Sequence, residues 1–200
     1  MSKSKPENNN SFIHYSLFII LFLLAFLERT VLDLGPNYEL LTTVMILSAF
    51  YLGRKQSFWL IFLVIAITDR LIGNSKIFLF TWSGFLIPAF VIPKLFGNWK
   101  LKIENSRWKV VLLSGTGVLS NLFFYFYTNM GVWLLDSWGM YTKDLWGLIS
   151  CYINALPFLK NQITSSLIFI PLGVVLTELA LHISKKYSTG EIIQIHKSIG

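Results

Sequence analysis

Polar and aromatic residues gather at the end of one strongly apolar run, which reads FFYFYTNMGVWLLDSWGMY over residues 123–141. Asn129, Trp133, Asp136 and Trp138 follow one another there at short intervals. An amide and a carboxylate can hold a polar ligand, and indole rings can stack against it or enclose it. An amide facing lipid would be costly to leave unsatisfied, so Asn129 is expected to face the protein interior. This stretch is therefore a candidate ligand-binding region.

A carboxylate near the end of another apolar segment is a second candidate. Asp69 follows the run SFWLIFLVIAIT, and an ionisable group at a membrane boundary is a functional candidate by default. Alternatively, Asp69 has only a structural role and forms an ion pair with Arg70 or Lys76. Asn129 likewise has a structural alternative, an ordinary hydrogen bond between helices. The full predicted set of substrate-binding residues is Asn37, Asp69, Trp82, Asn129, Trp133, Tyr141, Tyr152 and Asn161.

The composition indicates that these residues belong to a membrane protein. Of the 200 residues, 54% are hydrophobic and only 14% are charged, and the mean hydropathy is +0.59. A soluble domain would carry about 25% charged residues. The apolar residues fall into several separate runs, which predicts a multi-pass protein rather than a single-pass one. In that setting a net charge of +7 indicates cytoplasmic loops, not a nucleic-acid partner.

The apolar runs predict an all-α, polytopic bundle of six transmembrane helices. They lie at residues 11–27, 39–53, 57–73, 77–96, 110–135 and 163–183, within a membrane domain over 11–184. Residues 1–10 are expected to be a disordered cytoplasmic tail, 136–162 an outer loop or helix that caps the site, and 185–200 a second cytoplasmic tail. The first run could also be a signal peptide, but no small-x-small cleavage site follows it, which favours a retained helix.

The distribution of charge predicts the orientation. With both termini in the cytoplasm, the inner segments hold 12 of the 17 basic residues and the outer segments hold 5. Cytoplasmic loops are enriched in Lys and Arg, so the N and C termini are expected inside. The predicted site residues then lie at the outer side, and the expected location is the cytoplasmic (inner) membrane of a bacterium.

The sequence lacks the local signatures of common catalytic and metal sites. It contains no HExxH, Walker A or GxSxG motif, and its single cysteine, Cys151, excludes an internal disulfide. No catalytic residue, metal ligand or cofactor is therefore predicted. Gly115 and Gly117 predict a close helix contact, and Asn121 is expected to be an interior amide. Glu178 and His182 share a helix face and predict a local pair.

Several short motifs, taken in order, resemble a known family. They are GPN (35–37), Asp69 at a helix end, TNMGVW (128–133), Tyr141 and CYINALPFLKN (151–161). Together they resemble an uncharacterised family of bacterial membrane proteins similar to the S components of energy-coupling factor (ECF) transporters. The likeness spans roughly residues 35–179.

That resemblance implies an S-component-like bundle of six helices. S components bind vitamins, metal ions or their precursors from outside and dock onto a transmembrane coupling subunit driven by two ATPases. They often present an Ala-xxx-Ala-like face on the first helix, whereas the first helix here offers only Ser16 and Ala25. A coupling subunit with ATPases is therefore one partner to consider, beside a solitary transporter.

The expected function is capture and uptake of a small, vitamin-like organic nutrient from the outer side of the membrane. The protein is expected to be a transport component and not an enzyme. Its expected partners are this ligand and the lipid bilayer. Two alternatives stay open. One is a membrane assembly or helper protein without a small-molecule site. The other is a membrane-embedded enzyme acting on a lipid or prenyl substrate, for which Asp69 with Asp136 or Asp144 is the best available reactive pair.

Overall fold

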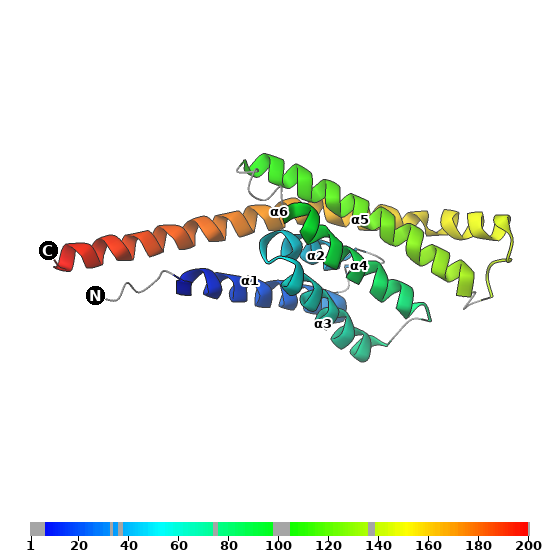
Figure 1. Cartoon of the computed structure of the whole chain (residues 1–200). Helices are drawn as coiled ribbons and strands as arrows, with labels where there is room; N and C mark the ends of the chain where they lie inside the picture. Colours follow the sequence, from blue (N-terminus) through cyan, green and yellow to red (C-terminus); the bar gives the residue numbers. More distant parts are fainter. Residues whose placement is uncertain are drawn as a thin grey trace.

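The structure, a computed structural model, describes residues 7–32, 34–35, 38–73, 76–97, 105–135 and 139–199, with side chains placed from Ile13 to Ser184 within these ranges. The described residues form six α-helices and one π-helix and contain no strand (Figure 1). The all-α prediction is therefore confirmed. The elements are α1 (Glu7–Leu27), η1 (Glu28–Leu32), α2 (Leu41–Tyr51), α3 (Arg54–Ile72), α4 (Phe78–Gly97), α5 (Ser106–Leu135) and α6 (Leu145–Ile199).

Four stretches of the described chain are long and apolar enough to cross a membrane: Ile13–Leu32, Phe78–Gly97, Ser106–Leu135 and Leu145–Ser184. Each contains at least the ~20 residues that a hydrocarbon layer requires. The helix α2 has only 11 residues, which at ~1.5 Å per residue reach about halfway across. The chain thus has the character of a multi-pass membrane protein in which α2 is too short to span.

The short helix α2 forms the centre of the bundle. All 11 of its residues are buried, and it packs against α1, α3, α4, α5 and α6. Leu41, Met45 and Ile46 are almost completely inaccessible. Because neighbouring helices surround α2, it can carry polar side chains without exposing them to lipid; the Ser48 hydroxyl, for example, donates to Met45 O at 3.0 Å. Gly53 then turns the chain directly into α3 at φ +90°.

Side chains from two other helices hold the C-terminal end of α2. The Tyr51 hydroxyl donates to Glu178 Oε1 at 2.8 Å. Lys109 Nζ makes an ion pair with the same oxygen, also at 2.8 Å. Through these two contacts Glu178 connects α6 to α2 and α5, which the predicted local pair with His182 did not anticipate.

The two longest helices, α5 and α6, form a hairpin with the most extensive contact in the bundle. The helix α6 starts at Leu145 and continues without a break to Ile199, so the boundary predicted between residues 162 and 163 is wrong. Pro157 and Pro171 lie inside α6 and do not end it, because packing along α5 outweighs the local loss of a backbone hydrogen bond. The predicted C-terminal tail is likewise helical through Ile199, and α1 begins at Glu7 rather than at residue 11.

The small residues of α5 differ in their surroundings. A Cβ atom on Gly117 would lie 2.3 Å from Ile170 Cδ1 of α6, whereas a Cβ atom on Gly115 would meet nothing within 4 Å. The predicted close helix contact is therefore confirmed for Gly117 and wrong for Gly115, which faces outward.

This difference predicts opposite effects for two substitutions on one helix. Gly117→Leu should destabilise the protein by at least about 2 kcal/mol, because the extra atoms overpack the contact between α5 and α6. Gly115→Leu is the matched control and should be neutral or stabilising, since its side chain enters open space. Thermal unfolding of both variants in detergent measures the effect. Equal loss of stability in the two variants would contradict this arrangement of α5 and α6.

Candidate functional site

A buried ion pair connects the first membrane helix to the third helix. Arg29 Nη2 donates to Asp69 Oδ1 at 2.7 Å, and Arg29 Nε donates to the neighbouring Thr68 hydroxyl at 2.8 Å. The second oxygen, Asp69 Oδ2, accepts a hydrogen bond from Trp82 Nε1 of α4 at 2.6 Å. Asp69 is only 8% exposed. The carboxylate is therefore held from two sides, by a guanidinium and by an indole.

The π-helix η1 brings the charged residues of this region inward. It continues α1 through Glu28–Leu32, beyond residue 27, at which the first apolar helix was predicted to end. Its first residue, Glu28, is 6% exposed, and Glu28 Oε2 accepts a hydrogen bond from Leu40 N at 3.2 Å. A π-turn inside a helix is rare and is frequent at functional sites. Here it places Glu28 and Arg29 beside the start of α2.

A second set of polar contacts continues from the start of α2 into the hairpin. Thr42 Oγ1 lies 3.2 Å from Glu39 Oε1 and 3.1 Å from Asn121 Oδ1 of α5. Asn121 is 1% exposed, and its Nδ2 donates to Gln162 O at 3.0 Å and to Ser166 Oγ at 2.8 Å. Glu39, Thr42 and Asn121 therefore connect α2 to α5 and α6.

We refer to these two sets together as the buried polar network. Four of its members are buried and three are half-buried: Glu28, Thr42, Asp69 and Asn121 are the buried ones, and Arg29, Glu39 and Trp82 are the half-buried ones. The network contains three carboxyl groups and one guanidinium, and the guanidinium is bonded to Asp69. Ionisable groups in a membrane bundle are expensive to bury and usually mark ligand or ion sites. This network is the candidate functional site.

Burial changes the ionisation of one member of the network. Glu39 lies in the connection between η1 and α2, outside the four candidate spans. Removal from water raises the pKa of Glu39 from 4.5 to about 7, and the nearby Glu28 adds to the increase. Arg29 and the Thr42 hydroxyl act in the opposite direction without cancelling it. Glu39 can therefore exchange a proton near neutral pH.

Asp136 and Trp138 of the opening motif lie outside the described residues, and the described end of the motif lies in a different place from the network, at the tip of the α5–α6 hairpin. Trp133 Nε1 donates to Thr142 O at 2.9 Å. Lys143 Nζ donates to the C-terminal carbonyl of Leu134 at 2.9 Å and lies over the Trp133 ring. Asp144 Oδ1 accepts from Gly147 N at 2.7 Å and caps the start of α6. These contacts close the turn between the two helices.

The other predicted residues of the tip also bond within the hairpin. Asn129 Nδ2 donates to Tyr125 O of its own helix at 2.8 Å. The Tyr152 hydroxyl donates to Phe126 O at 2.9 Å, and Asn154 Nδ2 donates to the Tyr141 hydroxyl at 3.4 Å. In the structure described here, these side chains direct their polar atoms toward α5 and α6.

The described members of the predicted set of eight site residues therefore lie in more than one place in the structure. Asp69 and Trp82 are in direct contact within the buried polar network. Asn129, Trp133, Tyr141 and Tyr152 lie together in the hairpin tip. Asn161 is half-buried on α6, and Asn37 lies outside the described residues.

Sequence reasoning did not select Glu28, Arg29 and Glu39 as site residues. One signal was available: Glu28 and Arg29 directly follow an apolar run, on the same predicted side of the membrane as Asp69. The π-turn that brings them inward is not visible in the sequence pattern.

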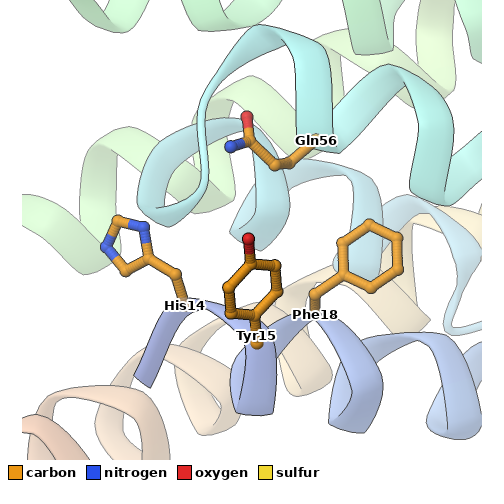
Figure 2. Close-up of a pocket in the computed structure, with 4 residues that line it drawn as sticks. All are labelled: His14, Tyr15, Phe18 and Gln56. Carbon is orange, nitrogen blue, oxygen red and sulfur yellow. The ribbon is translucent and has the colours of Figure 1, made fainter. Parts of the chain in front are cut away.

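Two pockets lie away from the network's carboxyl groups. One, of about 310 Å³, is lined by His14, Tyr15, Phe18 and Gln56, and Figure 2 shows the first three on α1 with Gln56 opposite them on α3. The other, of about 410 Å³, is an almost wholly apolar groove along α3 and α4 that includes one side of Trp82. Among the described residues no group of three or more His, Cys, Asp or Glu could hold a metal ion.

The ion pair predicts a specific pattern of stability. Arg29→Gln should cost about 3–5 kcal/mol, because it leaves the Asp69 carboxylate buried without its cation. Adding Asp69→Asn to that variant should restore part of the loss, since the unpaired charge is then removed. Arg70→Gln is the matched control: Arg70 is adjacent to Asp69 but exposed. Equal effects of Arg29→Gln and Arg70→Gln on thermal unfolding would disprove the pair.

Comparison with known proteins identifies a family. Residues 7–189 match the model of DUF6580, described as a family of unknown function. No curated protein and no solved structure matches the chain. The match covers every described helix at least in part, including each member of the buried polar network. The chain therefore belongs to the DUF6580 family.

Proposed function

We propose that this protein is a membrane-embedded substrate-binding component that captures a small organic nutrient from the outer side of the membrane. The buried polar network supplies the polar part of its binding site. The observation that carries this proposal is the Arg29–Asp69 ion pair at 2.7 Å with Trp82 bonded to the same carboxylate. In a bundle made mainly of apolar helices, such a group is costly unless it serves a ligand or an ion.

The shape of the bundle around the network supports a binding site. The helix α2 begins at Leu41, directly after Glu39, and is too short to span the membrane. Short or interrupted helices frequently form the substrate sites of membrane transporters, because their free backbone groups face a cavity rather than lipid. Trp82 also contacts the rings of Phe62 and Phe78, which gives the site aromatic walls of the kind that enclose small organic ligands.

The topology is consistent with uptake across a bacterial inner membrane. In Figure 1, α1 begins and α6 ends at the same end of the bundle, as six passages of the chain along it require. Basic residues lie on that side: Arg54 and Lys55 begin α3 next to Gln56, which lies opposite His14 of α1, and Lys109 bonds to Glu178 of α6. They favour a cytoplasmic position for it. The network lies toward the opposite ends of α1 and α3. A six-helix, S-component-like arrangement with cytoplasmic termini is therefore part of the proposal.

The resemblance to ECF S components suggests a vitamin-like ligand, but α1 gives little support for docking onto a coupling subunit. Its exposed side carries Ile19, Ile20, Leu23 and Leu24, whereas a close docking face needs small residues. Uptake without ATPases attached through α1 is thus the form we favour. The enzyme alternative loses one proposed partner, because Asp144 is bonded to Thr142 and Gly147 at the hairpin tip.

Ligand binding can be tested directly with the purified protein. Native mass spectrometry and a thermal-shift panel of vitamins and precursors should reveal a small organic ligand. Trp82→Phe removes the indole hydrogen bond that positions the Asp69 carboxylate in the site, and it should weaken ligand binding by about tenfold, since a hydrogen bond to a charged group contributes ~1.5–3 kcal/mol. Trp146→Phe is the control, because Trp146 is 75% exposed, and should bind normally.

Two outcomes would count against this function. If the folded wild-type protein carries no ligand and shows no thermal shift with any compound, the helper-protein alternative is favoured. If Trp82→Phe and Trp146→Phe bind equally well, a ligand exists but its site is elsewhere in the bundle.

A further inference from the structure

The hydrogen bonds around Thr42 require one more hydrogen than ionised side chains can supply. Its hydroxyl oxygen lies within 3.2 Å of Glu39 Oε1 and 3.1 Å of Asn121 Oδ1. A threonine hydroxyl has a single hydrogen to donate. An ionised carboxylate and an amide oxygen only accept. With Glu39 ionised, Thr42 could therefore satisfy one of these contacts but not both.

The orientation of Asn121 does not remove this conflict. Asn121 Nδ2 faces the backbone carbonyl of Gln162 at 3.0 Å and Ser166 Oγ at 2.8 Å. A backbone carbonyl can only accept, so the nitrogen of the amide must lie on that side. The oxygen of the amide then faces Thr42 and needs the Thr42 hydrogen.

A proton on Glu39 satisfies every contact. Glu39 Oε1–H donates to Thr42 Oγ1, Thr42 donates to Asn121 Oδ1, and Asn121 Nδ2 donates to Gln162 O and Ser166 Oγ. The Ser165 hydroxyl, which donates to Glu39 O at 2.6 Å, holds the backbone of Glu39 in place. A single directed chain of hydrogen bonds then runs from the connection before α2, through α5, to α6.

We propose that Glu39 is a proton-binding site: it holds a proton in the arrangement described here, and release of that proton loosens the start of α2 from the α5–α6 hairpin. An ionised Glu39 attracts the Thr42 hydrogen, which leaves Asn121 Oδ1 without its donor. The ligand of this site is thus a proton, and its binding is coupled to contact between helices. This property belongs to the network itself and does not rest on the proposed nutrient.

The charges around Glu39 favour proton binding over an ion pair. From η1, Glu28 and Arg29 are its charged neighbours, and Arg29 is bonded to Asp69 of α3. The described groups that contact it from α2 and α6, Thr42 and Ser165, are uncharged. Burial raises the pKa of Glu39 to about 7, so the proton is exchanged in the physiological range.

The sign of the pH dependence follows from this increase. An unfolded chain releases the Glu39 proton near pH 4.5, whereas the folded protein keeps it up to about pH 7. The stabilisation that depends on this proton is therefore complete below about pH 4.5 and is lost as the pH rises through about 7. The amide of Glu39→Gln stays neutral and can still donate to Thr42.

The first test compares thermal unfolding of wild type, Glu39→Gln and Glu178→Gln in detergent at about pH 5 and about pH 8. Glu39→Gln should match wild type at the lower pH and unfold roughly 3 °C or more above it at the higher pH. Glu178→Gln is the control: this glutamate of α6 contacts Tyr51 at the opposite end of α2, and the variant should keep the pH dependence of wild type. The same pH dependence in wild type and Glu39→Gln would overturn the proposal.

The second test observes the proton itself and does not need Glu39→Gln to fold. Infrared spectra of the wild-type protein at about pH 6 should contain the carbonyl stretch of a protonated carboxyl group, which disappears as the pH rises through about 7. Thr42→Val removes its hydrogen-bond partner and should shift this band to higher frequency. Absence of the band, or a band unaffected by Thr42→Val, would refute proton binding at Glu39. Loss of nutrient binding alone would leave the proposal standing.

Discussion

The enclosure of α2 by five other helices is the constraint on which the rest of the structure depends. An 11-residue helix cannot cross a bilayer, and its free ends would be costly in lipid. Neighbouring helices remove this cost. At one end Thr42 meets Glu39 and Asn121, and at the other end Tyr51 meets Glu178. The polar residues of the bundle therefore concentrate at the two ends of one short helix.

These two concentrations of polar groups differ in their charge balance. At the Tyr51 end, the Glu178 carboxylate forms an ion pair with the ammonium group of Lys109. At the Thr42 end, three carboxyl groups of the described network lie near the Arg29 guanidinium, which is bonded to Asp69. The first arrangement has what a purely structural contact requires. Among the described side chains, the second brings three carboxyl groups together in a place where burying charge is unfavourable, and for this reason we propose a function for it.

The coarse fold could be predicted from the sequence, because apolar runs of ~20 residues have few alternatives to helices. Five of the six predicted helices agree with the structure to within a few residues. The start of α6 could not be predicted, because residues 145–162 are less uniformly apolar than the run that follows, and packing against α5 joins both into one helix. The π-turn at Glu28 was missed for a similar reason: it is set by tertiary contacts and leaves no periodic signal.

The candidate site was predictable only in part. Asp69 and Trp82 were recognised individually, as a carboxylate and an indole near one membrane boundary, and the structure brings them into contact at 2.6 Å. Their partner Arg29 lies 40 residues earlier in the chain than Asp69, and sequence spacing contains no information about that pairing. Conversely, TNMGVW looked like a binding motif because amides and indoles suit both ligands and turns. In the described structure, Trp133 bonds to the turn itself.

The uninterrupted length of α6 has a mechanical consequence. A helix of 55 residues is roughly 80 Å long at ~1.5 Å per residue, more than twice the ~30 Å thickness of the hydrocarbon layer. Wherever it crosses such a layer, it must therefore extend well beyond it. A small change of tilt where Ser165 and Ser166 meet the core would sweep its far end through a much larger arc. Such a lever could carry an event deep in the bundle to the membrane surface.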